Sequence, residues 1–510
     1  LKFNNLEENI NSYNNLLGGY NKESLFLLNS SGAYLNDVIN NIFFIYNSLL
    51  MSGAQEESLL DPMSIYNLKF QVKEHATLKE LFLSFSKDNL TNDQRSYLEI
   101  NKTLEKLESD LLSNFNPDTL QEIKDLSSKK NSLLESIYAS NTTIKSLNNP
   151  IYPDLKTLKE KSFNNPILIP NMGSKDSFMV LIQNGDFRLF DVDMNKTHYE
   201  VYLKKINESI SKETSIDSLD YNYESAFRVY DSMFSDVLSQ VAIDQSLIIY
   251  GSDLSGLPVW ALPRNEPIDK DYLSNFLNAN WLINDYSFAF FFPISQSASP
   301  NKNYKNSFIG FGNPQLSKEF GLPSLTSAED EMIQLALYSG VSKDNVYLKQ
   351  KATKEIFLTK LAEPTKRFAV GTHSVAFDPS NKIFQPSLLF SGEDSIITAA
   401  DIVNTKISSE LVLLTACNTI KDKNNHNFTL LPRSFLVAGS NSVLFSNWNI
   451  ESISASEISK GIFRNLWLNN DLSIQESLRL SVKDALKNSD SIVYMHPKFW
   501  AGMSVAYGTI

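Results

Sequence analysis

The sequence predicts an α/β fold with a mostly parallel sheet flanked by helices, preceded by an all-α helical array. Two observations lead to this prediction. From residue 166 onward, short continuous apolar runs alternate with segments of helical periodicity, as expected for strands buried on both faces between covering helices. Before that point, apolar residues recur every three or four positions, and no alternating β-branched run interrupts them. The chain therefore divides into residues 1–165 and residues 166–510.

Composition limits the class of protein. The chain has 510 residues, 42% of them hydrophobic and 20% charged, so it can bury a large core in two or three domains. The net charge of -12 disfavours direct contact with nucleic acid and favours a protein partner. A single cysteine makes no internal disulfide, and no apolar stretch approaches the roughly 18 to 20 residues that span a bilayer. We predict a cytoplasmic protein without membrane contact. A removed leader is the alternative, because the sequence starts at Leu1 rather than Met.

Residues 1–165 are predicted to form an array of amphipathic helices. One segment carries apolar residues at helical spacing: Leu35, Val38, Ile39, Ile42, Tyr46 and Leu49. Helix pairs of this kind can stack as tetratricopeptide-like repeats that bind a partner protein, although the chain has no clean 34-residue signature. An ordinary helical lid or bundle is the alternative.

Residues 166–510 begin with a predicted hairpin. SFMVLIQ and FRLFDV flank Asn184 and Gly185, a pair that suits a type I′ turn because both central residues need a positive φ. Later apolar runs predict buried strands over 246–251, 307–312, 367–372, 411–416, 442–447 and 504–508. Three helices are predicted to begin at a serine that precedes an acidic residue by three positions: Ser327, Ser454 and Ser473.

Two of these predicted strands end in residues that carry chemistry. His373 closes the run KRFAVGTHS, and Cys417, the only cysteine, follows the similar run LVLLTA 44 positions later. A thiol and an imidazole at the ends of neighbouring strands are what a cysteine peptidase needs, and nucleophiles of open α/β sheets are common there. A buried cysteine that packs as a small hydrophobe is the alternative.

Several segments resemble the CHAT domain. GTHS, LLTACNT, AGSNSVLFSNWNIES, VKDALK and HPKFWAGMSVAYG follow the order of that family's landmarks, and GSDLSGLPVWALP, SFIGFGNP and LPSLTSAEDE precede them. The family consists of caspase-like and separase-like cysteine peptidases that often carry tetratricopeptide helices. The resemblance implies a caspase-like peptidase domain over residues 166–510, with an N-terminal part at 166–330 and a catalytic part at 331–510.

The resemblance also implies roles for single residues. Cys417 corresponds to the nucleophile and His373 to its acid–base partner, while backbone N–H groups at Cys417 and beside His373, at Thr372 and Ser374, would hold the oxyanion. The family usually has glycine where this chain has Ser374. If that position needs a positive φ, the serine is strained, and an inactive pseudo-peptidase that acts as an interaction scaffold becomes the alternative to an active enzyme.

Substrate preference rests on two acidic residues. Glu451, after the tryptophan of LFSNWNIES, and Asp253, after the first apolar run, are predicted to line an S1 pocket for a basic P1 side chain; exposed loop carboxylates without a role are the alternative. No metal-binding motif and no glycine-rich phosphate loop accompany them, so we expect neither a metal nor a cofactor. The predicted partners are a protein substrate and a regulatory protein bound by the N-terminal helices.

Overall fold

The computed structural model describes most of the chain: residues 6–19, 32–68, 91–113, 116–140, 152–211, 221–251, 253–268, 275, 278–294, 303–375, 386–415, 430–448, 450–488 and 492–508. Two compact units are present. The first comprises Leu1–Asp154 with Ile294–Ser297, and the second comprises Leu155–Pro293 with Ala298–Ile510. Each unit is considered by itself.

The first unit contains helices and no strand among its described residues, as predicted. Its α-helices are α1 (Leu6–Gly19), α3 (Gly32–Met51), α4 (Met63–Tyr66), α6 (Asn92–Ser113) and α7 (Pro117–Ser140). The apolar positions predicted in α3 are all buried, and Tyr46 packs on Tyr13 of α1 with ring centroids 6.0 Å apart. Helices α6 and α7 share a second apolar cluster around Ile100, Leu104 and Ile123. Each helix is thus held by one apolar stripe.

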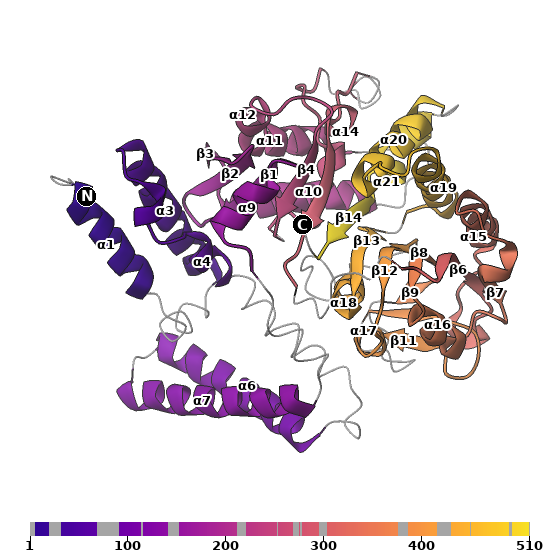
Figure 1. Cartoon of the computed structure of the whole chain (residues 1–510), viewed down its shortest axis with the longest axis horizontal. Helices are drawn as coiled ribbons and strands as arrows, with labels where there is room; N and C mark the ends of the chain where they lie inside the picture. The colour runs from indigo at the N-terminus through magenta and orange to yellow at the C-terminus, as the bar shows by residue number, and fades with distance from the viewer. Residues whose placement is uncertain are drawn as a thin grey trace. The chain divides into compact units, whose positions relative to one another are not determined.

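An eleven-stranded sheet forms the centre of the described part of the second unit, in the order β3-β2-β1-β4-β5-β14-β13-β12-β8-β6-β7 (Figure 1). The strands are β1 (Ile167–Met172), β2 (Ser177–Gln183), β3 (Asp186–Val192), β4 (Ser246–Tyr250), β5 (Ser287–Phe291), β6 (Asn306–Pro314), β7 (Val346–Lys349), β8 (Thr365–Gly371), β12 (Ser409–Leu414), β13 (Ser440–Ser446) and β14 (Met503–Tyr507). Most neighbours pair in parallel; the exceptions are β1 with β2, β2 with β3, and β13 with β14. The predicted mostly parallel α/β sheet is therefore confirmed, and each predicted strand coincides with an observed one.

Strand direction reverses once in the middle of the sheet. Strands β7, β6, β8, β12 and β13 run one way, whereas β14, β5, β4 and β1 run the other, because β13 and β14 are antiparallel. The carboxyl ends of β8 and β12 consequently share an edge with the amino ends of β4 and β5. The carboxyl end of β4 lies at the opposite edge.

The hairpin of β2 and β3 has the predicted turn. Asn184 and Gly185 have φ values of 53° and 83°, and Gln183 pairs with Asp186 across them. Both central residues therefore adopt the left-handed region that a type I′ turn requires.

Helix α15 (Thr326–Tyr338) approaches one face of the sheet at unusually short range. A Cβ atom at Gly312 would lie 2.7 Å from the backbone oxygen of Ala328, and one at Gly310 would lie 3.2 Å from Met332 Sδ. On the other face, Phe311 and Phe368 pack on Phe357 of α16 (Lys354–Leu361). The glycines of β6 therefore make room for α15 and fix its height above the sheet.

The remaining helices of the second unit cover the sheet around these strands (Figure 1). They are α9 (Leu155–Lys161), α10 (Lys196–Ser211), α11 (Tyr223–Met233), α12 (Ser235–Leu238), α14 (Leu282–Asp285), α17 (Ala399–Val403), α18 (Leu430–Ala438), α19 (Ser452–Leu468), α20 (Ile474–Lys487) and α21 (Pro497–Trp500). Helix α19 packs between α15 and α20.

One of the three predicted helix starts is confirmed and two are wrong. Ser473 caps α20, where its side chain accepts a hydrogen bond from the Glu476 N–H. Helix α15 begins one residue before Ser327, and α19 is capped by Glu451, so Ser454 lies inside the helix. A carboxylate at the N-cap accepts from the first turn as a serine does, which the serine pattern alone misses.

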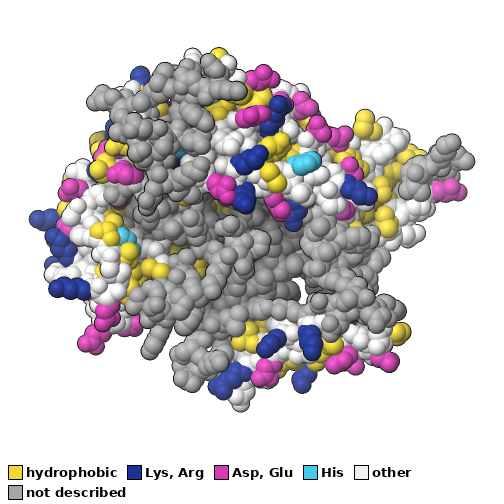
Figure 2. Space-filling model, turned by 180° about the vertical axis from the view of Figure 1, so that it is seen from behind, with side chains coloured by type: hydrophobic (Ala, Val, Ile, Leu, Met, Phe, Trp, Pro, Cys, Tyr) yellow, Lys and Arg dark blue, Asp and Glu magenta, His cyan; other side chains and the backbone are white. Residues whose placement is uncertain are grey.

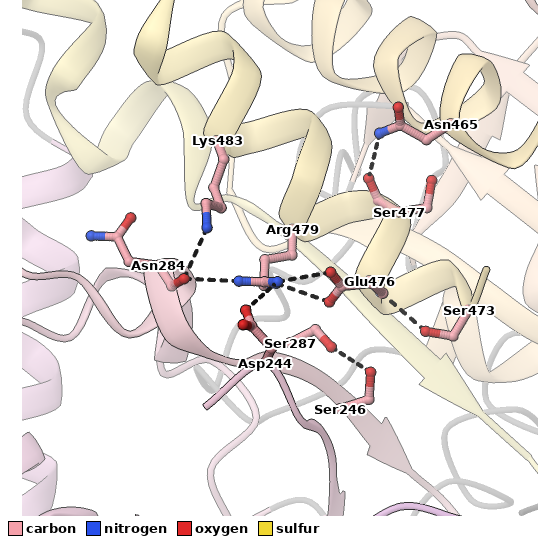
Figure 3. Close-up of polar contacts among 10 residues, drawn as sticks. All are labelled: Asp244, Ser246, Asn284, Ser287, Asn465, Ser473, Glu476, Ser477, Arg479 and Lys483. Carbon is pink, nitrogen blue, oxygen red and sulfur yellow. Dashed lines mark hydrogen bonds and ion pairs between the residues drawn. The ribbon is translucent and has the colours of Figure 1, made fainter. Parts of the chain in front are cut away.

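Buried Arg479 anchors α20 to the segments that precede β4 and β5 (Figure 3). Its guanidinium donates to both carboxylate oxygens of Glu476 at 2.9 Å, to Asp244 Oδ1 at 2.8 Å and to the Asn284 carbonyl at 2.8 Å. Lys483 donates to the same carbonyl at 3.0 Å. We call these five residues the Arg479 clamp; it fixes the amino ends of two strands.

The surface of the described residues carries both signs of charge. Lysine and arginine side chains alternate with aspartate and glutamate on the face that Figure 2 shows. Among the described residues, no helix is long and apolar enough to cross a membrane.

Candidate functional site

His373 follows β8, and its strand is the direct neighbour of the strand that precedes Cys417. Val370 of β8 pairs in parallel with Leu414 of β12, and the Thr415 N–H donates to the Val370 carbonyl at 3.0 Å. His373 and Cys417 each stand three positions beyond these paired residues in the sequence. Cys417 itself lies outside the described residues, so its role remains a prediction.

A backbone carbonyl orients the imidazole of half-buried His373. Nε2 lies 2.7 Å from the carbonyl oxygen of Pro323, in the loop before α15. A carbonyl oxygen can only accept, so Nε2 carries the proton and the neutral ring has its lone pair on Nδ1. Nδ1 is then the nitrogen available to take a proton from a thiol. Because every residue has a carbonyl, the sequence held no signal for the part played by Pro323.

Ser374, which follows His373, lies in extended backbone. Ser374 begins β9 (Ser374–Val375), which with β10 (Ser387–Leu389) and β11 (Ile396–Thr398) forms a small antiparallel sheet. The Thr372 hydroxyl donates to the Leu389 carbonyl, and the Leu389 N–H donates to the His373 carbonyl at 3.0 Å. Ser374 is absent from the described non-glycine residues that have a positive φ. The left-handed strain considered for a serine at this position does not arise.

Glu331 is a buried acid next to the ends of β8 and β12. Its residue is 3% exposed, and its Oε2 accepts a long hydrogen bond of 3.4 Å from Thr415 Oγ1. Desolvation by burial raises the pKa of Glu331 to about 7, although nearby Ser459, Lys460 and Thr415 lower it. Glu331 is not among the site residues predicted from the sequence, since an acidic residue on a helix is normally exposed. We call Pro323, Glu331, Gly371, His373 and Thr415 the β8–β12 exit.

The two acidic residues predicted for an S1 pocket lie at opposite edges of the sheet. Glu451 follows β13 and shares the edge of the β8–β12 exit, but its Oε2 accepts from both the N–H and the hydroxyl of Ser454 at 2.9 and 3.0 Å. Asp253 follows β4, whose carboxyl end lies at the other edge. The sheet therefore does not bring Asp253 together with His373.

A cleft opens beside His373 at the carboxyl ends of β6 and β7. It has a volume of about 290 Å³ and is lined by Asn313, Pro314, Gln315, Leu316, Leu322, Pro323, Ser324 and Lys349. Pro323 thus contacts the imidazole with its carbonyl and also borders the cleft. The Lys349 ammonium lies 3.2 Å from Glu329, so charges of both signs meet there. Within the described residues, no group of three His, Cys, Asp or Glu side chains could hold a metal ion.

The sequence matches the model of the CHAT domain over residues 225–509, which is more than half of the chain. The chain belongs to the CHAT domain family. The resemblance predicted from the sequence is thereby confirmed. No match was found among curated proteins.

Solved structures that the chain matches include separase and gingipain. The separase–securin complex of Saccharomyces cerevisiae has a TM-score of 0.42 at 11% identity, over 95% of this chain and 43% of the other. The Arg-specific cysteine proteinase gingipain R has a TM-score of 0.33 at 8% identity, over 61% and 73%. A complex of the pro- and mature domains of RgpB from Porphyromonas gingivalis has 0.32 at 10%, over 61% and 76%. This chain spans less than half the length of the separase chain that it matches.

Proposed function

We propose that this protein is a cysteine endopeptidase that uses His373 and Cys417 as a dyad. The observation that carries the proposal is the parallel pairing of β8 with β12, because residues equally far beyond paired positions are delivered to one edge of a sheet. The orientation of the His373 imidazole by the Pro323 carbonyl supports it. Membership of the CHAT domain family, whose known chemistry is of this kind, supports it further.

The reaction follows from these groups. Nδ1 of His373 takes the thiol proton, and the Cys417 thiolate attacks a peptide carbonyl. The tetrahedral intermediate collapses to a thioester as the C–N bond breaks, and the imidazolium gives its proton to the departing amine. His373 then takes a proton from water, whose oxygen attacks the thioester; the acid product leaves and the thiol is restored. The Nε2–H bond to Pro323 orients the ring in both its neutral and its protonated form.

Backbone N–H groups at Cys417 and beside His373, at Thr372 or Ser374, are proposed to bind the oxyanion. Ser374 keeps its N–H and has no left-handed strain, which favours an active enzyme over a pseudo-peptidase. The cleft beside Pro323 offers room for part of the substrate.

We further propose a basic P1 side chain, selected by Glu451, which lies at the same edge as His373. Only Oε2 of this carboxylate serves the helix cap. Asp253 is not part of the proposed S1 pocket, because the strand before it ends at the opposite edge of the sheet. A protein partner that binds the N-terminal helices is proposed to regulate cleavage.

A cysteine-directed probe tests the proposal. The full chain is treated with a basic acyloxymethylketone, alone and with any co-purifying partner, and labelling is compared with that of Cys417→Ala. Because Cys417 is the only cysteine, labelling should vanish in this variant. His373→Ala should label at least about 100-fold more slowly, whereas exposed His198→Ala should label like wild type. Labelling that is slow in wild type and unchanged by loss of His373 would instead favour the pseudo-peptidase.

Substrate preference is tested separately with fluorogenic peptides that vary only at P1. Cleavage after Arg or Lys supports the role of Glu451, and Glu451→Gln should raise KM for these peptides. A preference for Asp at P1 would contradict this part of the proposal.

A further inference from the structure

One buried carboxylic acid at the β8–β12 exit has no part in the reaction proposed above. Oε1 of Glu331 has no hydrogen-bond partner within the described part of the chain, and the hydrogen bond between Oε2 and Thr415 Oγ1 is long, at 3.4 Å. A cavity of about 20 Å³ adjoins the side chain and is also lined by Gly371 and Thr415. Buried polar atoms are nearly always paired, so an unsatisfied oxygen between two strand ends calls for an explanation.

Helix α15 and the loop before it touch both strand ends. Pro323, three residues before the helix, holds the His373 imidazole at 2.7 Å. Glu331, inside the helix, contacts Thr415, which stands two positions before Cys417 in the sequence. Gly371 allows this approach, since a Cβ atom there would lie 3.0 Å from Ala328.

We propose that Glu331 is a positioning residue for Cys417, acting through Thr415, so that α15 sets the spacing between the two members of the dyad. This rests on the proposed function, because it concerns the same site.

The hydroxyl of Thr415 explains how the carboxyl group would act. Its single proton has two acceptors, Glu331 Oε2 at 3.4 Å and the Val370 carbonyl at 3.3 Å. A protonated Glu331 can donate to Thr415 Oγ1, which leaves the hydroxyl proton for Val370 and links α15, β12 and β8 in one chain. An ionised Glu331 takes that proton for itself and breaks the chain. The neutral acid is therefore the form that ties the two strand ends together.

The charged groups around Glu331 leave burial as the dominant influence. From α19, Lys460 lowers the pKa of Glu331 and Glu457 raises it, and these two side chains are paired with each other at 3.0 Å. From β7, the Lys349 ammonium is paired with Glu329. Desolvation holds the pKa at about 7, so both forms are populated near neutral pH.

The alkylation rate of Cys417 tests this proposal directly. Since the chain has one cysteine, iodoacetamide reports on Cys417 alone in the full-length protein. Glu331→Gln keeps a neutral hydrogen-bond donor, so its Cys417 should be alkylated at the same rate as that of wild type at pH 6. As the pH rises through about 7, the alkylation rate of wild type should fall below that of Glu331→Gln, by about tenfold at pH 8.5, because the ionised acid no longer holds the strand end.

Two further variants complete the experiment. Glu331→Ala should lower kcat for a cleaved peptide by about tenfold with KM unchanged, while Asp330→Asn, an exposed acid on the same helix, should behave like wild type. Superimposable pH profiles of wild type and Glu331→Gln would overturn the proposal, even if Glu331→Ala fails to fold. Alkylation needs no peptide cleavage, so failure of the proposed function, seen as absent Cys417-dependent cleavage, is distinguishable from failure here.

Discussion

The Arg479 clamp and the β8–β12 exit lie at the same edge of one sheet, yet they are built differently. Arg479 is buried and donates four hydrogen bonds of 2.8 to 2.9 Å, three of them to carboxylate oxygens, so its charge is satisfied. Glu331 is equally buried, but its hydrogen bond to Thr415 measures 3.4 Å and its Oε1 lacks a partner among the described residues. A satisfied buried charge holds an element in place, whereas an under-satisfied one beside candidate catalytic residues is better explained by function.

The largest expected difference is in catalysis. His373→Ala should lower the rate of Cys417-dependent cleavage by about 100 to 10,000 fold, because the base and acid of the reaction are lost, with little change in stability. Steady-state kinetics and urea unfolding of the same samples measure the two effects. If His373→Ala loses as much free energy of unfolding as it loses in transition-state stabilisation, the β8–β12 exit is mainly structural, like the clamp.

Removing the clamp should lower the stability of the fold more than the rate of catalysis. Arg479→Ala should lower the free energy of unfolding by about 4 kcal/mol, since it leaves the Glu476 and Asp244 carboxylates without their cation. Arg464→Ala, which breaks the exposed pair with Asp484, is the matched control and should cost less than about 1 kcal/mol. Similar losses in the two variants, read from urea midpoints, would remove the distinction between the clamp and a surface ion pair.

The contribution of Glu331 to stability should be visible in the pH dependence of the unfolding free energy. Its folded-state pKa of about 7 lies above the ordinary value of 4.5, so the folded chain binds the extra proton. The stability that this provides is complete below pH 4.5 and is lost as the pH rises through about 7, amounting to about 3 kcal/mol. Glu331→Gln should lack this decline in unfolding free energy between pH 5 and pH 8. If the unfolding free energies of wild type and Glu331→Gln change with pH in parallel, Glu331 is ionised in the folded protein over this range.

The smallest effect concerns Glu451, which sits at the same edge but serves a helix. Glu451→Ala should cost about 1 kcal/mol of stability, because α19 loses its N-cap. Thermal unfolding beside Glu457→Ala, an exposed acid of the first turns, provides the comparison. A basic P1 preference that survives Glu451→Ala would assign the residue to the cap alone.

Much of the fold was predictable because its signals are local. Buried strands appear as apolar runs, and the Asn184–Gly185 turn depends on two residues alone. Strand direction is not a local property. The apolar run that forms β4 does not indicate that this strand runs opposite to β12, and this direction decides at which edge of the sheet Asp253 lies. The strands and the turn could therefore be predicted from local sequence patterns, whereas the direction of each strand, which depends on its pairing with other strands, could not.

The site was predictable only as far as residue type reveals role. His373 and Cys417 drew attention because histidines are few and cysteine is single. Pro323 acts through its carbonyl, Glu331 through its burial, and Glu451 through a cap that a serine was expected to provide. Each of these depends on tertiary surroundings that one sequence does not encode separately.

The glycines beneath α15 have a mechanical consequence. Gly310 and Gly312 present no side chain of their own to α15, so the helix packs closely on β6 through its own buried residues, such as Ala328 and Met332. Helix α15 and β6 are therefore expected to move together. A regulator that displaces α15 would have to displace β6 with it, so regulation of the proposed peptidase is better sought beyond the strand ends than beneath the helix.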